Sequence, residues 1–263
     1  MASLAARFFT AVDSLLRSVR PTWWGAVVTD DRFPDIYDLN YARVTAEDPD
    51  LGLDEVLAEL RPALTRGGSR HEHVVVLTEH GARRLIEEAR GAGHRVSHDS
   101  VMEFRSRPKA VTPSDVLVVE ADPDHPSLWV VLRSAYREFD VTAPNVVEQL
   151  LAWNREVLAP AGRRYFVAHR DGRVAGMGAI QVRDGVAYVD DVVTFPEHRR
   201  RGVASAVVRR LVKETTGADA TFLLADQPDP IRLYRSLGFE ETGRLVSTLY
   251  GSVTTGSGDG IPR

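Results

Sequence analysis

The chain of 263 residues contains no cysteine. This absence excludes disulfide bonds, thiolate metal sites and a cysteine nucleophile, and with them any acyl transfer through an acyl-cysteine intermediate. No apolar run reaches the roughly 20 residues that a membrane-spanning helix needs. The chain also has no large excess of positive or negative charge, since 33 basic and 37 acidic residues give a formal net charge of −4. We therefore expect neither a nucleic-acid partner nor a membrane partner.

The remaining composition is that of a globular protein, with 43% hydrophobic and 27% charged residues. The length suggests about two domains of ordinary size. Residues Met1–Arg20 place apolar side chains on one helical face, but Arg7 and Asp13 interrupt the uninterrupted apolar core that a signal peptide requires. The pattern predicts an amphipathic N-terminal helix that packs on its own domain, in a cytoplasmic protein.

One stretch in the second half of the chain carries the strongest signal for function. An apolar strand, Val189–Phe195, leads through a basic turn into an amphipathic helix that ends near Glu214. The first amides of a helix lack acceptors and, with the positive end of the helix dipole, bind phosphate groups. Arginines add charge, and glycine allows close approach. The predicted phosphate-binding residues are Arg199, Arg200, Arg201, Gly202, Val203, Ala204 and Ser205.

The spacing Arg199-x-x-Gly202-x-Ala204, after a strand that ends Thr-Phe-Pro, resembles the acyl-CoA pyrophosphate loop of the GNAT superfamily of N-acetyltransferases. A second segment, Leu233–Phe239, reads LYRSLGF and is similar to the LYxxLGF segment of that superfamily. The lysine of a P-loop and the third glycine of a dinucleotide fingerprint are absent from the basic turn. The two motifs stand in the expected order, and the resemblance covers about half of the chain.

The order of elements agrees with this resemblance. From Asp115 to Tyr250 the pattern predicts β-α-α-β-β-β-α-β-α-β, with tight turns at Asp171-Gly172 and Asp184-Gly185. The predicted fold class is α+β: the GNAT fold, a mostly antiparallel mixed sheet flanked by helices. We expect an N-terminal α/β domain at 1–108, a linker within Ser106–Pro113, a catalytic domain at 115–250 and a disordered tail at 251–263.

The N-terminal part contains a faint repeat of the C-terminal part. Residues His73–Phe104 and Thr221–Tyr250 both run from a strand through a polar turn, a short helix and a glycine to an apolar strand. We interpret the first half as a degenerate GNAT-like unit, with coincidence between two ordinary βαβ pieces as the alternative. Because it has neither the Arg-x-x-Gly-x-Gly/Ala loop nor a counterpart of Tyr234, it should not bind CoA.

The resemblance implies acetyl-CoA as co-substrate and assigns its contacts. The strand end Val192, Val193 and Thr194 would pair with the pantetheine arm, and the Val193 amide would serve the thioester carbonyl. Relatives often carry asparagine where Gln227 stands, which leaves one pantetheine or acceptor contact in doubt.

Acyl transfer to an amine needs a proton donor for the thiolate and a base for the ammonium. Tyr234 fits the donor, because a phenol has a pKa of about 10; a merely packed tyrosine is the alternative. Asp190 and Asp191 are the candidate bases, of which strand alternation should turn only one toward the cleft. A salt bridge with an arginine is the alternative for them. His71, His73 and His80 match no zinc pattern, so we expect no metal.

The sequence thus predicts an N-acetyltransferase that moves an acetyl group from acetyl-CoA directly to an amine, on a small molecule or a protein. One alternative is a non-catalytic acyl-CoA sensor. Another is a nucleic-acid binder that uses Arg199–Arg201, whose binding would depend steeply on salt. The acceptor pocket should involve Pro126–Ala161. The identity of the acceptor and the oligomeric state stay open, with a homodimer among the alternatives.

Overall fold

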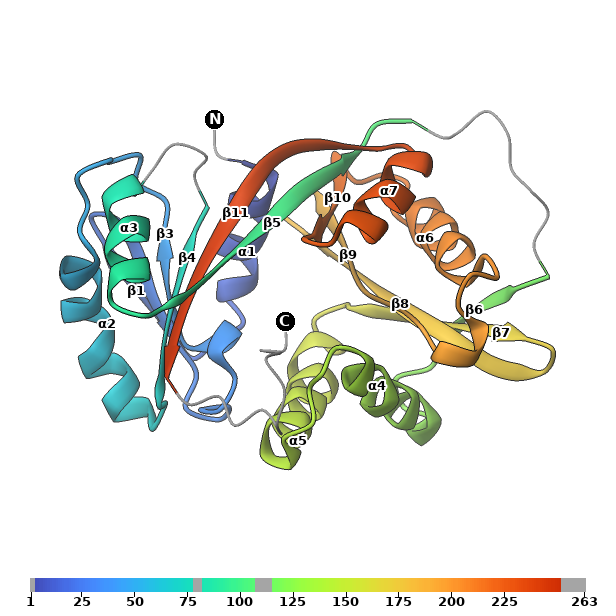
Figure 1. The fold of residues 1–263 in the computed structure, drawn as a ribbon. Helices are drawn as coiled ribbons and strands as arrows, with labels where there is room; N and C mark the ends of the chain where they lie inside the picture. Colours follow the sequence, from blue (N-terminus) through green and yellow to red (C-terminus); the bar gives the residue numbers. More distant parts are fainter. Residues whose placement is uncertain (1–2, 78–81, 107–114, 252–263) are drawn as a thin grey trace. The chain divides into compact units, whose positions relative to one another are not determined.

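The structure is a computed structural model that describes residues 3–77, 82–106 and 115–251. Its residues form two compact units (Figure 1). The first comprises the chain up to Val101 and the stretch that begins at Thr242, and the second comprises Met102–Glu241. Strands β5 (Arg95–Phe104) and β11 (Phe239–Gly251) therefore contribute residues to both units. Most of the predicted linker and the predicted tail after Gly251 lie outside the described residues.

The first unit combines a strand meander with helices packed on its sheet. Its further elements are α1 (Leu4–Asp13), β1 (Ser18–Thr22), β2 (Gly25–Thr29), η1 (Tyr37–Leu39), β3 (Tyr41–Val44), α2 (Leu53–Gly67), β4 (His71–Val76) and α3 (Arg83–Gly91). Strands β1, β2 and β3 are successively antiparallel, β3 and β4 are parallel, and β4 and β11 are antiparallel. Apolar side chains of α2 and α3 form a buried core with Val74 and Val76 of β4.

The N-terminal helix is shorter than predicted. It ends at Asp13, and the last residues of the predicted helix, from Ser18 on, belong to β1, a strand that the sequence analysis missed. Strand β1 lies at the edge of its sheet and is largely exposed, so it has no apolar alternation that a pattern could reveal. Pro21 is compatible with this position because the outer side of an edge strand needs no amide donor.

The second unit has its helices and strands in the predicted order, from its first strand to its last. Its elements are β6 (Leu117–Ala121), α4 (Pro126–Glu138), α5 (Pro144–Trp153) with a π-helical turn η2 (Asn154–Leu158), β7 (Arg164–Arg170), β8 (Arg173–Arg183), β9 (Val186–Thr194), η3 (Pro196–His198), α6 (Val203–Glu214), β10 (Ala220–Ala225) and α7 (Pro228–Ser236), followed by β11. The mixed sheet flanked by helices confirms the predicted fold class.

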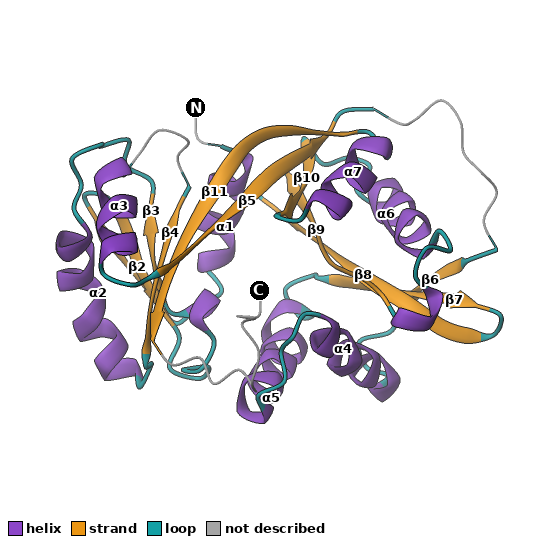
Figure 2. Cartoon of the chain, viewed as in Figure 1, coloured by secondary structure: helices purple, strands orange, loops and turns teal. Residues whose placement is uncertain are grey.

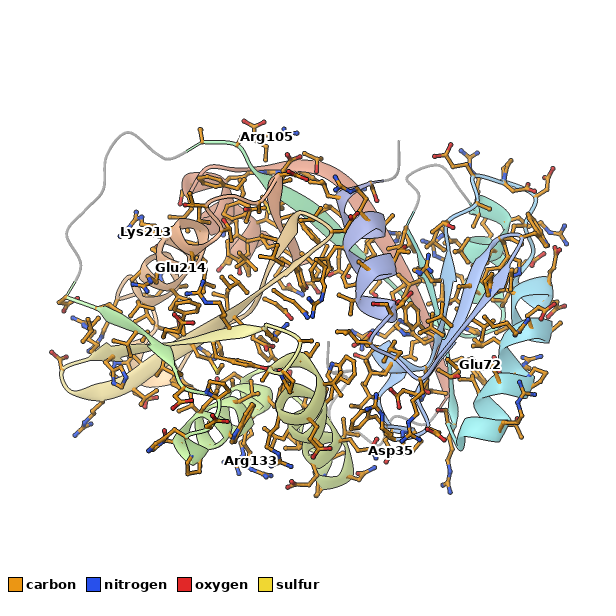
Figure 3. The ribbon with its side chains drawn as sticks, turned by 180° about the vertical axis from the view of Figure 1, so that it is seen from behind. Asp35, Glu72, Arg105, Arg133, Lys213 and Glu214 are labelled. Carbon is orange, nitrogen blue, oxygen red and sulfur yellow. The ribbon has the colours of Figure 1, made fainter. Side chains whose placement is uncertain are left out.

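The sheet of the second unit is antiparallel from β6 to β9, and β10 then pairs in parallel with β9. The turns at Asp171-Gly172 and Asp184-Gly185 have positive φ at both residues, as the predicted tight hairpins require. Helices α6 and α7 pack on one face of the sheet, and α4 and α5 pack on the other (Figure 2). Arg133 of α4, labelled in Figure 3, donates to Glu148 of α5 at 2.6 Å.

The two units repeat one topology. Three antiparallel strands lead into a helix, a strand parallel to the third one follows, and a second helix precedes a long strand. In the first unit this series is β1-β2-β3-α2-β4-α3-β5, and in the second it is β7-β8-β9-α6-β10-α7-β11. The observed repeat supports the GNAT-like interpretation of the N-terminal half. Among the described residues no helix is both long and apolar enough to cross a membrane.

Candidate active site

The end of strand β9 carries a bulge at the predicted base. Gly178 of β8 opposes two residues of β9, Asp191 and Val192. Asp191 has a φ of 50°, a left-handed backbone that aspartate tolerates better than most residues. A bulge adds one residue to a strand and redirects the groups that follow it. The bulge therefore sets the direction of the backbone at the strand end.

The backbone direction after the bulge changes one predicted contact. The Phe195 amide donates to the carbonyl of Ala175 on β8 at 3.0 Å. Because amide direction alternates along a strand, the Val193 amide also points toward β8. The amides of Val192 and Thr194 point to the opposite side. The geometry thus favours Val192, and not the predicted Val193, as the amide that can meet a ligand.

Strands β9 and β10 diverge beside this backbone. Their parallel register joins Val186–Tyr188 to Ala220–Phe222 and continues no further in the described part of the chain. Strand β9 nevertheless runs on to Thr194, and β10 is its neighbour on this side in the sheet order. After Tyr188, the edge of β9 that faces away from β8 is thereby left without a strand partner. An extended ligand can form main-chain hydrogen bonds with an edge of this kind.

The loop before α6 has the geometry of an anion site. Gly202, the N-cap of α6, has a φ of 78°, and a Cβ atom added there would meet nothing within 4 Å. The first intrahelical bond runs from the Ala206 amide to the Gly202 carbonyl at 3.0 Å. The amides of Val203, Ala204 and Ser205 therefore precede the helical bonding pattern and can bind an external acceptor.

The three arginines of this loop differ in their surroundings. Arg199 donates to Glu138 at the end of α4 at 2.6 Å and to the Thr194 carbonyl at 3.3 Å. Its side chain is thus held by the protein, although it is 56% exposed. Arg200 and Arg201 are exposed, and Arg200 has a φ of 60°. These two arginines provide the positive charge that lies open to solvent beside the helix start.

Asp190 and Asp191 share one arginine, although strand alternation would turn their side chains to opposite faces of the sheet. One nitrogen of Arg163, Nη2, donates to Asp190 Oδ2 at 2.8 Å and to Asp191 Oδ2 at 2.6 Å. Both carboxylates reach the same group because the left-handed backbone at Asp191 interrupts the alternation. Burial and the neighbouring Asp190 raise the pKa of Asp191 to about 6, although Arg163 lowers it.

The salt bridge that we considered as the alternative for the two aspartates is therefore present, and it does not remove them from the site. Asp190 keeps 34% of its side chain exposed, whereas Asp191 keeps 15% and Arg163 keeps 4%. The more exposed carboxylate can still meet a ligand. The sequence analysis missed Arg163 because an arginine just before a strand carries no pattern that would place it in the interior.

Tyr234 lies on α7 in the core between that helix, α6 and the sheet. Tyr234 is only 8% exposed, and the centre of its ring lies 6.1 Å from the centre of the Phe239 ring. Burial and the charge of Asp190 raise the pKa of Tyr234 to about 12. The phenol therefore keeps its proton at neutral pH and lies within electrostatic range of the candidate base. Packing and a role as proton donor are compatible here.

A buried polar network supports the carboxylates from the side of α4 and β7. Asn154, in the π-helical turn η2, donates to the Tyr136 hydroxyl at 2.8 Å and accepts from the Tyr165 hydroxyl at 2.8 Å. The Arg163 guanidinium lies 5.8 Å from the centre of the Tyr165 ring. Burial raises the pKa of both tyrosines, so both are neutral. The sequence analysis did not identify this network.

The remaining predicted residues have other partners. Gln227 is the exposed N-cap residue of α7, and its side-chain amide donates to Asp226 at 3.3 Å. His71 and His73 lie in the first unit and contact the carbonyls of Asn40 and Tyr37. His80 lies outside the described residues. In the described ranges no three histidine, aspartate or glutamate side chains are arranged to hold a metal ion.

In the first unit, the start of α2 corresponds to the start of α6, and a side chain of the protein itself binds there. Glu88 of α3 accepts from the Leu53 amide, the first residue of α2, at 2.7 Å. The same carboxylate is bound by Arg84 at 2.7 Å. These contacts lower the pKa of Glu88, the largest effect coming from the backbone bond. A carboxylate thus occupies the position where the second unit leaves its amides open.

Comparison with known proteins agrees with this geometry. Residues 126–239 match the family described as the acetyltransferase (GNAT) family. A search of curated proteins found no match.

Among solved structures, a functionally unknown conserved protein from Staphylococcus epidermidis has a TM-score of 0.69 at 14% identity, over 87% of this chain and 91% of that chain. A GCN5-related N-acetyltransferase from Kribbella flavida has a TM-score of 0.62 at 19% identity, over 93% and 94% of the two chains. A tandem GNAT protein from the clavulanic acid biosynthesis pathway has a TM-score of 0.51 at 19% identity, over 78% and 70%. Identities this low show the fold alone, but the family match adds the function class. Residues 126–239 of this chain form an acetyltransferase domain of the GNAT family.

Proposed function

We propose that this protein transfers an acetyl group from acetyl-CoA directly to a primary amine. The family match supports acyl transfer as the reaction class. The finer assignment depends on one observation: the unpaired edge of β9 after Tyr188 is followed, after the short turn η3, by the open helix start at Gly202. An extended arm that lies along the strand edge thus leads to a site for its diphosphate.

The coenzyme contacts follow from the backbone. The amides of Val203, Ala204 and Ser205, with Arg200 and Arg201 beside them, hold the diphosphate. Main-chain groups of β9 bind the pantetheine arm, and the Val192 amide polarises the thioester carbonyl. This polarisation stabilises the negative charge that develops on the carbonyl oxygen in the transition state.

The reaction consumes one ammonium and one thioester. A carboxylate of the Asp190–Asp191 pair accepts a proton from the ammonium, and the neutral amine attacks the carbonyl carbon. The carbon–nitrogen bond forms, and the carbon–sulfur bond breaks with its electron pair on sulfur. Tyr234 protonates the thiolate and recovers a proton from the nitrogen. The products are the N-acetyl amide, the CoA thiol and one proton released to solvent.

Two measurements on the full chain test this function. Calorimetry with acetyl-CoA alone should show binding at micromolar to millimolar concentrations. Thiol release from acetyl-CoA should depend on an added amine, tested with phenethylamine, spermidine, glucosamine and a lysine-containing peptide. Binding without turnover for any amine would favour the acyl-CoA sensor. No heat with acetyl-CoA at millimolar concentration would contradict both functions.

A further inference from the structure

The carboxylate pair at the β9 bulge is bound by a single buried cation. Arg163 uses one nitrogen for both aspartates, at 2.8 and 2.6 Å. The Nε atom of Arg163 is buried, and no hydrogen-bond partner for it lies among the described residues. Arg163 thus binds both carboxylates through a single nitrogen, Nη2. Its guanidinium also lies over the ring of Tyr165.

The charges in this cluster do not cancel. Two carboxylates and one guanidinium leave one net negative charge when both acids are ionised. The groups that face Asp191 come from three elements of the second unit and the turn before β7. They are Asp190 on β9, Tyr165 on β7, Tyr136 on α4 and Arg163 in that turn, while Tyr234 on α7 faces Asp190. The three tyrosines are neutral. In the described part of the cluster Arg163 is thus the group that offsets the carboxylate charge.

Burial makes the remaining negative charge costly. Asp191 is largely buried, and a buried charge is stable only with a partner that neutralises it. The cluster can reach neutrality in two ways: it can bind a cation, or it can take up a proton. An amine acceptor supplies both in turn, since it arrives as an ammonium and leaves a proton behind. Asp190, the more exposed of the pair, lies where the ammonium can reach it.

We propose that Arg163 is a positioning residue for the transfer reaction: it holds Asp190 and Asp191 as one unit with a single negative charge, which binds the acceptor as a monocationic ammonium and removes one proton from it. This inference rests on the proposed function for the transfer step. The chemical class of the acceptor is accordingly a primary amine that is protonated at neutral pH. The arginine itself touches neither the thioester nor the nitrogen.

The ionisation of Asp191 can be measured without turnover. Full-length protein labelled with ¹³C at the aspartate carboxyl is titrated by NMR, and the Asp191 signal is identified by its loss in Asp191→Asn. In the wild-type protein this signal should titrate near pH 6, in keeping with the pKa of about 6. In Arg163→Met the midpoint should move up by roughly 1 to 3 pH units, because an opposite charge has been removed.

Arg164→Met is the matched control, since it removes the same charge from the neighbouring residue. Arg164 is the next residue, and its guanidinium donates to Glu120 on β6 and to Glu214 on α6, which is labelled in Figure 3. It is 37% exposed and makes its ion pairs away from the two aspartates. The Asp191 midpoint should be unchanged in this variant. An equal midpoint in Arg163→Met and the wild type, with acetyl-CoA binding retained, would overturn the proposal.

A second variant covers the case in which Arg163→Met does not fold. The double variant Asp190→Asn/Arg163→Met removes one carboxylate together with the arginine and so restores a single negative charge. It should fold, and Asp191 should titrate closer to its wild-type midpoint than in Arg163→Met or, if that variant is unfolded, than in the equally neutral Arg163→Gln. A double variant that is also unfolded would show that Arg163 is needed for packing and would overturn the charge argument.

Activity is measured with whichever of the four amines named above gives the fastest thiol release in the wild-type protein. In Arg163→Met the acid limb of kcat should move to higher pH, whereas in Arg163→Lys, which keeps the positive charge, it should move less. The KM for acetyl-CoA should stay within about twofold of wild type in both variants, because the change affects the base and not the coenzyme. A fall in kcat that is uniform across pH would contradict the role. If no amine reacts in the wild type, the proposed function fails, while the NMR titration still decides whether Arg163 sets the charge of the pair.

Discussion

Tyr234 shows how one side chain combines packing and chemistry. It belongs to the buried core beneath α6 and α7, and its pKa of about 12 keeps the phenol protonated at neutral pH. A proton donor of this kind acts only when a strong base develops next to it, as a thiolate does when the thioester breaks. The sequence motif placed this residue, but the burial that raises its pKa is a property of the folded core.

We predict that Tyr234→Phe lowers kcat by roughly 10²- to 10⁴-fold, the usual contribution of a general acid. The acetyl-CoA dissociation constant should stay within about twofold, because the ring and its packing are retained. Steady-state thiol release and calorimetry measure the two quantities. Tyr250→Phe is the control, since it removes a phenol that stacks on His94 in the first unit. Turnover of Tyr234→Phe within about twofold of wild type would remove the residue from the mechanism.

At the residue scale the sequence identified the acids but not their arrangement. Alternation along β9 predicted that one of Asp190 and Asp191 faces the cleft. The left-handed backbone of Asp191 interrupts the alternation and lets both carboxylates reach Arg163, and which of them faces a ligand stays a prediction. Arg163 was missed for a related reason. Its burial is decided by β9 and α4, which lie elsewhere in the sequence.

The start of α6 is the element on which the coenzyme site depends. Gly202 has two separable properties, a positive φ and open space where a side chain would stand. The positive φ favours glycine at this position, and the open space leaves room for a ligand. The adjacent amides are oriented by the helix whatever the side chains are, so charge placed at this position acts directly on the ligand.

We predict that Gly202→Glu weakens acetyl-CoA binding by about tenfold or more, since a carboxylate at the helix start repels the diphosphate and competes for its amides. Gly217→Glu is a matched control after the other end of α6. That glycine also has a positive φ, 102°, and open space for a Cβ atom, so strain and charge change are comparable. Calorimetry should show wild-type affinity for Gly217→Glu. Equal affinities for the two variants would refute the site.

At the element scale, periodicity predicted most of the second unit well. The order β-α-α-β-β-β-α-β-α-β and both hairpin turns are confirmed. Deviations occur where an element has no buried face, as in the exposed edge strand β1, or where it changes its winding, as in the π-helical turn at Asn154–Leu158. At β1 the local sequence lacks the apolar alternation that identifies a strand, whereas at Asn154–Leu158 the apolar spacing is helical and does not reveal the change of winding.

Across the whole molecule, the two units share a topology but differ at the helix start that follows the third strand. The second unit leaves its amides open at Gly202, whereas the first binds the Leu53 amide with its own Glu88. An internal carboxylate competes with any external anion at such a position, because it is held at high effective concentration. The repeat therefore provides two matching positions and one open site.

We predict that the full chain binds one acetyl-CoA. Calorimetric titration should give a stoichiometry of one, and Gly202→Glu should reduce the whole heat signal, since no second site remains to contribute. The accuracy of the protein concentration is checked with Gly217→Glu, which should also give one. A stoichiometry of two, or a residual site of wild-type affinity in Gly202→Glu, would show that the first unit binds the coenzyme as well.

The sequence by itself determined the order of elements, the hairpin turns, the position of the helix start after the basic turn and the family resemblance. These features are encoded in local spacing, where neighbouring residues set backbone conformation directly. Only the tertiary structure decided that Asp190 and Asp191 share Arg163, that β9 bulges opposite Gly178, and that Glu88 binds the Leu53 amide at the helix start of the first unit. These outcomes depend on contacts between residues far apart in the chain, and burial and charge at such contacts arise only when the fold brings them together.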